Sequence, residues 1–149
     1  MLFRSPKTVS LAATKVYDGN TSLSADQVTV TTGVGSETLN ATGTANNANV
    51  AITDKYFTAA TLANGTGSSA GLASNYQLPT LDNTTAAVTI TPKTVSLAAT
   101  KVYDGNTSLS ADQVTVTTGV GSETLNATDR KSTRLNSCHS QQSRMPSSA

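Results

Sequence analysis

The chain contains no tryptophan, and its single cysteine and single histidine stand side by side near the end, at Cys138 and His139. Residues 6–128 therefore contain no Cys, His or Trp, and they also contain no Arg. These absences exclude zinc sites of the usual kind, nucleophiles activated by histidine and disulfide scaffolds from this segment. The absence of arginine also argues against bidentate phosphate recognition and against nucleic-acid binding by counterion release.

Both ends of the chain resemble translated sequencing-library adapter. Residues 129–139 match the translation of a common adapter at every position except Cys138, and residues 1–5 match a translation of its other end. Segments of this kind are excluded from fold reasoning. The alternative is a basic, Ser-rich arm that contacts nucleic acid or a membrane. We predict that residues 1–5 and 129–149 are adapter-derived, the latter as a disordered tail.

Without its ends the chain is weakly acidic. Residues 6–128 carry five lysines against eight aspartates and glutamates, a net charge of 5 − 8 = −3. Thr, Ala, Asn, Ser, Val and Gly are in excess, a mixture that favours strands and turns. No apolar run is long enough to cross a bilayer. We therefore expect neither nucleic-acid binding nor membrane insertion by this segment.

The rest of the chain is a tandem repeat. Residues 6–42 recur unchanged as residues 92–128, which is 37 identical residues at an offset of 92 − 6 = 86. A period of this size is a small domain, so we predict one complete repeat at 6–91 and the first part of a second at 92–128. The short Thr91-Pro92-Lys93 junction predicts a semi-rigid rod. The alternative is a chimeric assembly, in which the period is an artefact.

Apolar residues alternate with polar ones along much of the repeat. Val9, Leu11 and Ala13 share one face of a strand that ends at the Asp18-Gly19-Asn20 turn. A single helical turn is expected at 24–27, and the longest loop at 64–74. Further strands are expected at 27–32, 37–45, 49–53, 56–62 and 86–90.

About seven short strands separated by turns predict an all-β fold, a β-sandwich. The segment Leu72–Tyr76 resembles the loop into a tyrosine corner, in which the Tyr76 hydroxyl would bond to upstream backbone. This favours an immunoglobulin-like sandwich over the alternative, a β-grasp fold. The second copy ends at Thr128, about half way through the domain, and therefore lacks strands with which its first half would pair.

The turn in each copy is the candidate ligand-binding site. Its aromatic ring could stack on a sugar, and its oxygens could bind calcium. The opposing interpretation is a turn that fixes strand register, because one carboxylate per turn gives calcium too few ligands and the calcium-loop spacing is absent. The candidate residues are Tyr17, Asp18 and Asn20, with Tyr103, Asp104 and Asn106 in the second copy.

Catalysis by a glycosidase would require two carboxylates facing each other across a cleft. The carboxylates of the repeat each lie beside a turn or strand end, where solvated acids are usual, so we predict no enzyme activity, no catalytic residue, no cofactor and no metal. The six Asn-x-Ser/Thr sequons mark accessible loops if they are used. The carboxylates considered are Asp18, Asp26, Glu37, Asp54 and Asp82, and the sequons begin at Asn20, Asn40, Asn64, Asn83, Asn106 and Asn126.

The heptad Lys15–Thr21, the later Asn75–Leu78 and the closing Ala87–Lys93 resemble the YDG repeat of large bacterial surface proteins. Those proteins are described as filamentous-haemagglutinin-like or two-partner-secreted adhesins. The resemblance covers residues 6–128, although the usual Gly-Asp and Val-Gly pairs are hard to place between Thr32 and Ala59. The resemblance assigns no catalytic residue to this chain. It implies a location at the bacterial cell surface, in association with the outer membrane.

These observations lead to two hypotheses of function. The first is a stalk repeat that projects a distal binding region of a secreted or surface-attached adhesin, with neighbouring repeats of the same chain as its partners. The second is a β module that binds host glycans by the avidity of repeated Tyr17 and Tyr103 turns. Under the first hypothesis, host glycans or host proteins would be reached through the parent protein.

Overall fold

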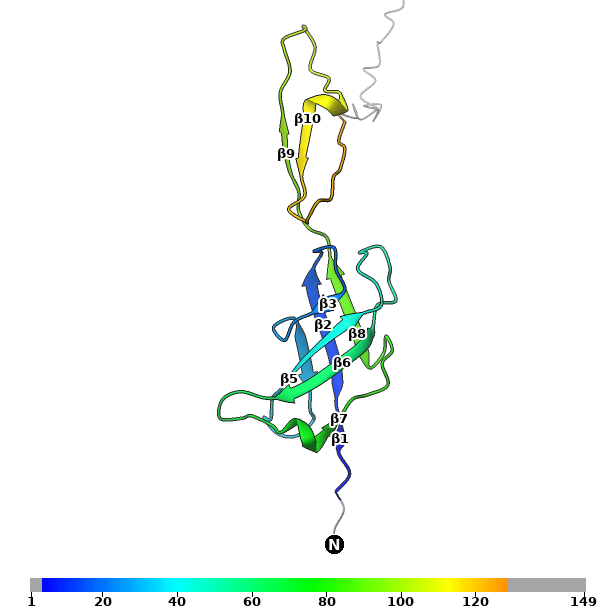
Figure 1. Ribbon diagram of the computed structural model, residues 1–149, viewed down its shortest axis with the longest axis vertical. Helices are drawn as coiled ribbons and strands as arrows, with labels where there is room; N and C mark the ends of the chain where they lie inside the picture. The colour runs from blue at the N-terminus through cyan, green and yellow to red at the C-terminus, as the bar shows by residue number, and fades with distance from the viewer. Residues whose placement is uncertain (1–3, 129–149) are drawn as a thin grey trace, which may run out of the picture. The chain divides into compact units, whose positions relative to one another are not determined.

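The computed structural model describes residues 4–128, and most of the expected adapter-derived ends, residues 1–3 and 129–149, lies outside the described residues. Within that range the chain forms two compact units (Figure 1). The first comprises residues 4–94 together with 118–123, and the second comprises 95–117 together with 124–128. Strands and turns make up both units, with no α-helix among residues 4–128, so the all-β prediction is confirmed.

Two three-stranded sheets form the body of the first unit. In Figure 1, β5 and β6 lie across β2 and β8. One sheet has the order β4 (Val28–Thr31), β2 (Ser10–Val16) and β8 (Ala86–Thr91), and the other has the order β3 (Ser22–Leu23), β5 (Leu39–Ala45) and β6 (Phe57–Asn64).

Two further pairings complete the first unit. A small parallel sheet joins β1 (Lys7–Thr8) to β7 (Tyr76–Gln77). The two main sheets are joined by an antiparallel bridge between Tyr56 and Ala87, supported by the Val88 N–H donating to the Lys55 carbonyl oxygen at 3.0 Å. One edge of the layered pair is therefore partly closed.

Strand β2 is the central strand of its sheet. Its alternation agrees with the sequence prediction, because Leu11 and Ala13 are buried on the face that Val9 also shares. It pairs antiparallel with β4 and parallel with β8, in a register that runs from Leu11↔Ala86 to Val16↔Thr91. The first long strand of the repeat is thus held by its last one.

The core lies between the two sheets and is made mainly of small and aliphatic side chains. Phe57 is fully buried at its centre. Gly43 on β5, which pairs with Ala60 of β6, leaves room for the ring, since a Cβ at that position would lie 2.6 Å from Phe57 Cδ1 and 2.5 Å from the Ala59 carbonyl oxygen. The buried cluster consists of Val9, Leu11, Ala13, Leu23, Val28, Leu39, Ala41, Ala45, Phe57, Tyr76, Ala86, Val88 and Ile90.

The prediction of a strand at 49–53 is wrong, because this segment forms a turn. The buried Lys55 ammonium explains the difference. It donates hydrogen bonds to the carbonyl oxygens of Val50, at 3.0 Å, and of Ile52. The Asn47 side chain also accepts from the Asn49 N–H at 2.7 Å. The lysine contacts direct the two backbone carbonyl oxygens toward one cation, so these oxygens cannot accept hydrogen bonds from a neighbouring strand.

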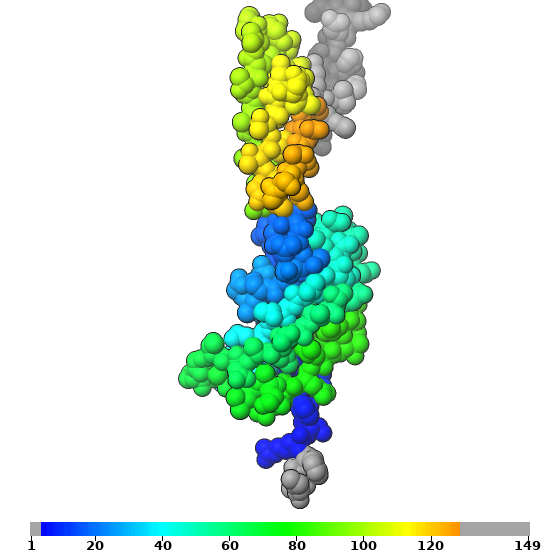
Figure 2. All heavy atoms as spheres, viewed as in Figure 1, coloured from blue at the N-terminus to red at the C-terminus, as the bar shows by residue number. Residues whose placement is uncertain are grey.

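The other expected strands and the expected long loop agree closely with the structure. Strand β6 covers most of the segment expected at 56–62, with Phe57 on its inner face. The expected long loop follows it and stands out from the side of the first unit, in green in Figure 2, before the short 3₁₀ turn η1 (Ala73–Asn75). Residues 24–27, where a single helical turn is expected, form a hydrogen-bonded turn in which the Gln27 N–H donates to the Ser24 carbonyl oxygen at 3.0 Å. Only the equivalent residues of the second copy form a 3₁₀ turn, η2 (Ala111–Gln113), which is closed by a capping box.

The second unit contains one antiparallel pair, β9 (Ser96–Ala99) with β10 (Val114–Thr117). Its side chains lack the cover that their counterparts have in the first unit. Leu97 is 63% exposed, whereas Leu11, the same residue of the repeat, is 4% exposed. Among residues 4–128 there is no helix with the length and apolar character that a membrane span requires.

Candidate functional site: the Tyr-Asp-Gly turn

A buried lysine lies at the centre of the candidate turn. The Lys15 ammonium donates hydrogen bonds to the carbonyl oxygen of Asn20 at 3.2 Å, to Asn20 Oδ1 at 3.1 Å and to the carbonyl oxygen of Ser22 at 2.9 Å. It also forms an ion pair with Asp18 Oδ1 at 2.6 Å. Since an ammonium has three N–H donors, these four acceptors satisfy it fully.

The local sequence explains why the chain curls around this ammonium. Lys15 continues the inward face of β2, so its side chain enters the protein at the end of the strand. Gly19 takes a φ of +82°, which a residue without Cβ adopts at little cost. Asp18 Oδ1 then accepts from the Asn20 N–H at 3.1 Å, and Asn20 Oδ1 from the Ser22 N–H at 3.0 Å. Side chains that bond nearby backbone in this way stabilise tight turns.

The second copy builds the same arrangement around Lys101. Its ammonium donates to the Asn106 carbonyl oxygen at 3.1 Å, to Asn106 Oδ1 at 3.0 Å and to the Ser108 carbonyl oxygen at 2.9 Å. It pairs with Asp104 at 2.7 Å. This unit has only two strands among its described residues. The turn therefore depends on the heptad itself more than on the surrounding sheets.

The tyrosines of the turn stand apart from these lysine contacts. The Tyr17 hydroxyl donates to Glu123 Oε1 at 2.5 Å, and both residues belong to the first compact unit. This hydrogen bond raises the pKa of Tyr17, and partial burial and the charges of Glu123 and Asp18 raise it further. Tyr103 is 92% exposed. The structure thus brings Asp18 and Asn20 together around the lysine, packs the half-buried Tyr17 against the core and leaves Tyr103 outward.

This geometry bears on the candidate ligand chemistry. Burial raises the pKa of Asp18, but hydrogen bonds from Lys15 and Asn20 lower it by more, so the carboxylate stays ionised beside the ammonium. A calcium ion bound to the oxygens of Asp18 and Asn20 would have to displace the Lys15 ammonium or be repelled by its positive charge. Within residues 4–128 no group of three or more His, Cys, Asp or Glu side chains is placed to hold a metal. The arrangement favours a register-fixing turn, and ligand binding at these residues stays a prediction.

Two other carboxylates of the repeat, Asp82 and Asp26, are each held by a local turn. Asp82 accepts hydrogen bonds from the Thr84 hydroxyl at 2.6 Å and the Thr84 N–H at 2.9 Å. It also accepts from the Thr85 hydroxyl at 3.0 Å and the Thr85 N–H at 2.9 Å. These hydrogen bonds hold the pKa of Asp82 well below its usual range. A hydrogen bond with the Ser24 side chain lowers the pKa of Asp26. Each of these acids is therefore engaged by its own turn.

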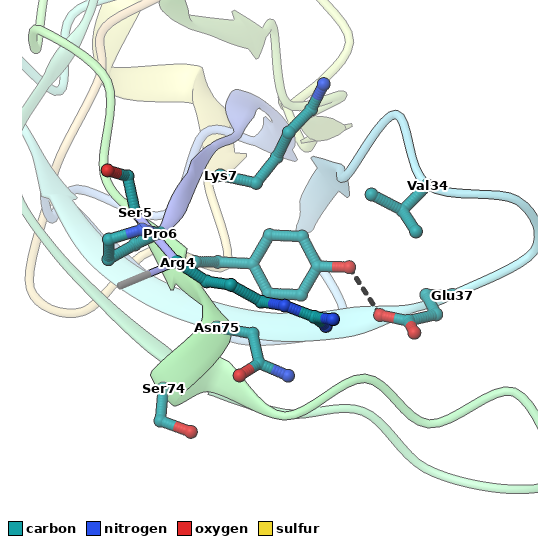
Figure 3. Close-up of a pocket in the computed structure, with 9 residues that line it drawn as sticks. Arg4, Ser5, Pro6, Lys7, Val34, Glu37, Ser74 and Asn75 are labelled. Atoms are coloured by element: carbon teal, nitrogen blue, oxygen red, sulfur yellow. Dashed lines mark hydrogen bonds between the residues drawn. The ribbon is translucent and has the colours of Figure 1, made fainter. Parts of the chain in front are cut away.

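A pocket that sequence reasoning missed lies at the start of the first unit (Figure 3). It has a volume of about 380 Å³, and Val34 and Glu37 stand on one of its sides. The Tyr76 hydroxyl donates to Glu37 Oε2, the bond drawn dashed in Figure 3. The expected tyrosine corner is therefore wrong. A carboxylate 39 residues upstream, and not backbone, accepts from this hydroxyl, because the loop before β5 carries Glu37 over the ring.

We predict that Lys15→Met lowers the free energy of unfolding of the chain by about 2 kcal/mol, because it leaves the carbonyl oxygens of Asn20 and Ser22 without their donor. The Asp18 side chain is 43% exposed and can regain water, so its loss of a partner adds little. Denaturant unfolding of the full chain measures the change.

The matched control is Lys101→Met, which removes the same contacts in the second unit. We expect it to change the main unfolding transition by less than about 0.5 kcal/mol, because the first unit holds the described core. Equal effects of the two substitutions, or no effect of the first, would contradict the structural role of Lys15.

Comparisons with curated proteins and with solved structures gave no match. A family model described as the YDG domain matches residues 5–87. The match covers 87 − 5 + 1 = 83 of the 149 residues and includes the lysine-centred turn and most of the two sheets. Because more than half of the chain is matched, the chain belongs to the YDG domain family.

Proposed function

We propose that this chain is part of a stalk in a large secreted or surface-attached bacterial adhesin of the filamentous-haemagglutinin-like type. The observation that carries the proposal is the unchanged repetition of residues 6–42 as 92–128. Strand β8 ends at Thr91 and the next copy begins at Pro92, so no linker separates the copies. Domains repeated without linkers give length, and length is the task of a stalk.

The working mechanism of such a stalk is to hold a distal binding region away from the outer membrane. Its partners are the neighbouring repeats, and host glycans or proteins are bound elsewhere in the parent protein. The side chains of the turn support this role, because Lys15, Asp18 and Asn20 bind one another. In this proposal the chain carries no enzyme activity and needs no cofactor.

A direct test uses chains with one, two and three complete copies of residues 6–91 measured by small-angle X-ray scattering. We expect the maximum dimension to rise by a constant increment with each copy, because each repeat contacts only its neighbours. A dimension that grows as the square root of copy number, as in a flexible coil, would contradict a stalk.

We also infer that residues 1–5 and 129–149 are adapter-derived, because they match adapter translation at nearly every residue. A long sequencing read across the source gene tests this. We expect the reading frame to pass from Thr128 into a residue equivalent to Gly43 and then into the remainder of the second repeat. A genomic sequence that encodes Asp129 to Ala149 would overturn the inference.

The second candidate function is a glycan-binding module, and the exposed Tyr103 ring beside the exposed Val102 favours it. An outward aromatic face is suited to stacking on a sugar. A glycan array probed with the full chain tests this function. Binding that disappears in the double variant Tyr17→Ala/Tyr103→Ala while its cooperative unfolding is retained, but persists in the control Val102→Ala, would support the module. Absence of binding by the unchanged chain would argue against it.

A further inference from the structure

One hexapeptide loop occurs twice in the first compact unit, as residues 32–37 and as residues 118–123. We call it the valine loop. Both copies have the same internal hydrogen bonds. The Thr32 hydroxyl donates to the Glu37 carbonyl oxygen at 3.0 Å and accepts from the Val34 N–H at 3.3 Å. The Thr118 hydroxyl does the same at 3.2 Å and 3.2 Å. The loop is therefore one preformed structure in two places.

The surroundings of the two valine loops differ. Val120 is 6% exposed, whereas Val34 is 39% exposed. The difference comes from the Tyr17 turn, because a Cβ at Gly19 would lie 3.0 Å from Val120 Cγ1. Beside this contact, Glu123 accepts the hydrogen bond of the Tyr17 hydroxyl. The downstream loop thus covers the turn of the first copy, and within residues 4–128 no such turn lies against the upstream loop.

The order of the chain explains why these two parts meet. The Tyr17 N–H donates to the Thr91 carbonyl oxygen at 2.9 Å, so the turn lies beside the end of β8. The next copy begins at once with Pro92 and Lys93. The Lys93 Cε would lie 3.3 Å from a Cβ at Gly119 in the valine loop that follows. A direct junction therefore delivers each valine loop to the turn of the copy before it.

At the start of the first copy the corresponding surface is a pocket, which Arg4 and Ser5 also line. Val34 and Glu37 line the pocket of about 380 Å³, and Figure 3 shows both side chains at its edge. Glu37 Oε2 accepts from Tyr76, and within residues 4–128 no hydrogen bond reaches its Oε1. In the downstream loop, Oε1 of the equivalent Glu123 is the atom that accepts from Tyr17.

We propose that the surface formed by Val34 and Glu37, with Glu37 held by the buried Tyr76, is the docking surface for the Tyr17 turn of a preceding copy of this repeat. The Glu37 carboxylate then bridges two phenols, with one oxygen accepting from Tyr76 of its own copy and the other from the preceding copy's tyrosine. Val34 packs on the glycine of that turn, as Val120 packs on Gly19. This inference rests on the proposed tandem array.

Nuclear Overhauser contacts from valine methyl groups test the docking. In the present chain we expect contacts between the Val120 methyls and the Gly19 α-protons, and none between Val34 and a glycine of that turn. A longer chain, with one more copy of residues 6–91 placed before Pro6, should show a second set of the same contacts, now from Val34 to the added turn.

Two variants complete the test in both chains. Because aspartate has no methyl group, docking in the variants is followed by contacts between the glutamate γ-protons and the tyrosine ring of the docked turn. Val34→Asp should remove the contacts of Glu37 with the added tyrosine in the longer chain and leave those of Glu123 with Tyr17 unchanged. Val120→Asp is the matched substitution and should remove the contacts of Glu123 with Tyr17 in the present chain. If Val34→Asp prevents folding, as judged by loss of cooperative unfolding, Val34→Ala takes its place, because it removes the packed methyl groups without adding a charge.

Absence of the second set in the folded longer chain would overturn the docking surface, and so would persistence of the contacts between Glu37 and the added tyrosine in the Val34 variant. Neither result affects the stalk proposal, which depends on the scattering increment per copy. An irregular increment together with a complete second set of contacts would instead leave the docking surface standing and overturn the stalk.

Discussion

Parallel pairing of β8 with β2 is the interaction on which the rest of the repeat depends. Six residue pairs join the last strand of the repeat to its first long strand, from Leu11↔Ala86 to Val16↔Thr91. This pairing places Val88 and Ile90 in the core and brings the Thr91 carbonyl oxygen to the Tyr17 N–H. The candidate turn, the core and the junction with the next copy are all positioned by it.

The two copies show what this pairing contributes, because they share 37 identical residues and differ in their surroundings. In the first copy β2 runs for seven residues, whereas in the second copy the equivalent β9 runs for four. The lysine-centred turn survives in both copies, since its acceptors lie within seven residues of the lysine. Local contacts fix the turn, and strand length is set by partners that are distant in the sequence.

Sequence reasoning succeeded where the determining contacts are local and periodic. The alternation of apolar and polar residues identified β2 and β8. The same alternation continues to position 15, so it could have predicted that Lys15 is buried, but the sequence analysis did not identify Lys15 as buried. The segment 49–53 was misassigned because alternation there competes with Lys55, whose ammonium binds two carbonyl oxygens of the turn. The pairing of Glu37 with Tyr76 spans 39 residues and has no periodic signature, so it required the structure.

The direction of the paired strands has a mechanical consequence. Strands β2 and β8 run parallel, so the chain enters the repeat near the start of one and leaves it at the end of the other. A pull applied through Pro6 and Pro92 therefore acts along the strands in opposite senses and loads their ladder of hydrogen bonds in shear. Bonds loaded in shear must break together, whereas bonds that are peeled apart break singly. A repeat tethered at both ends would resist tension through its first and last strands, and its lifetime under load would follow the rate of unfolding.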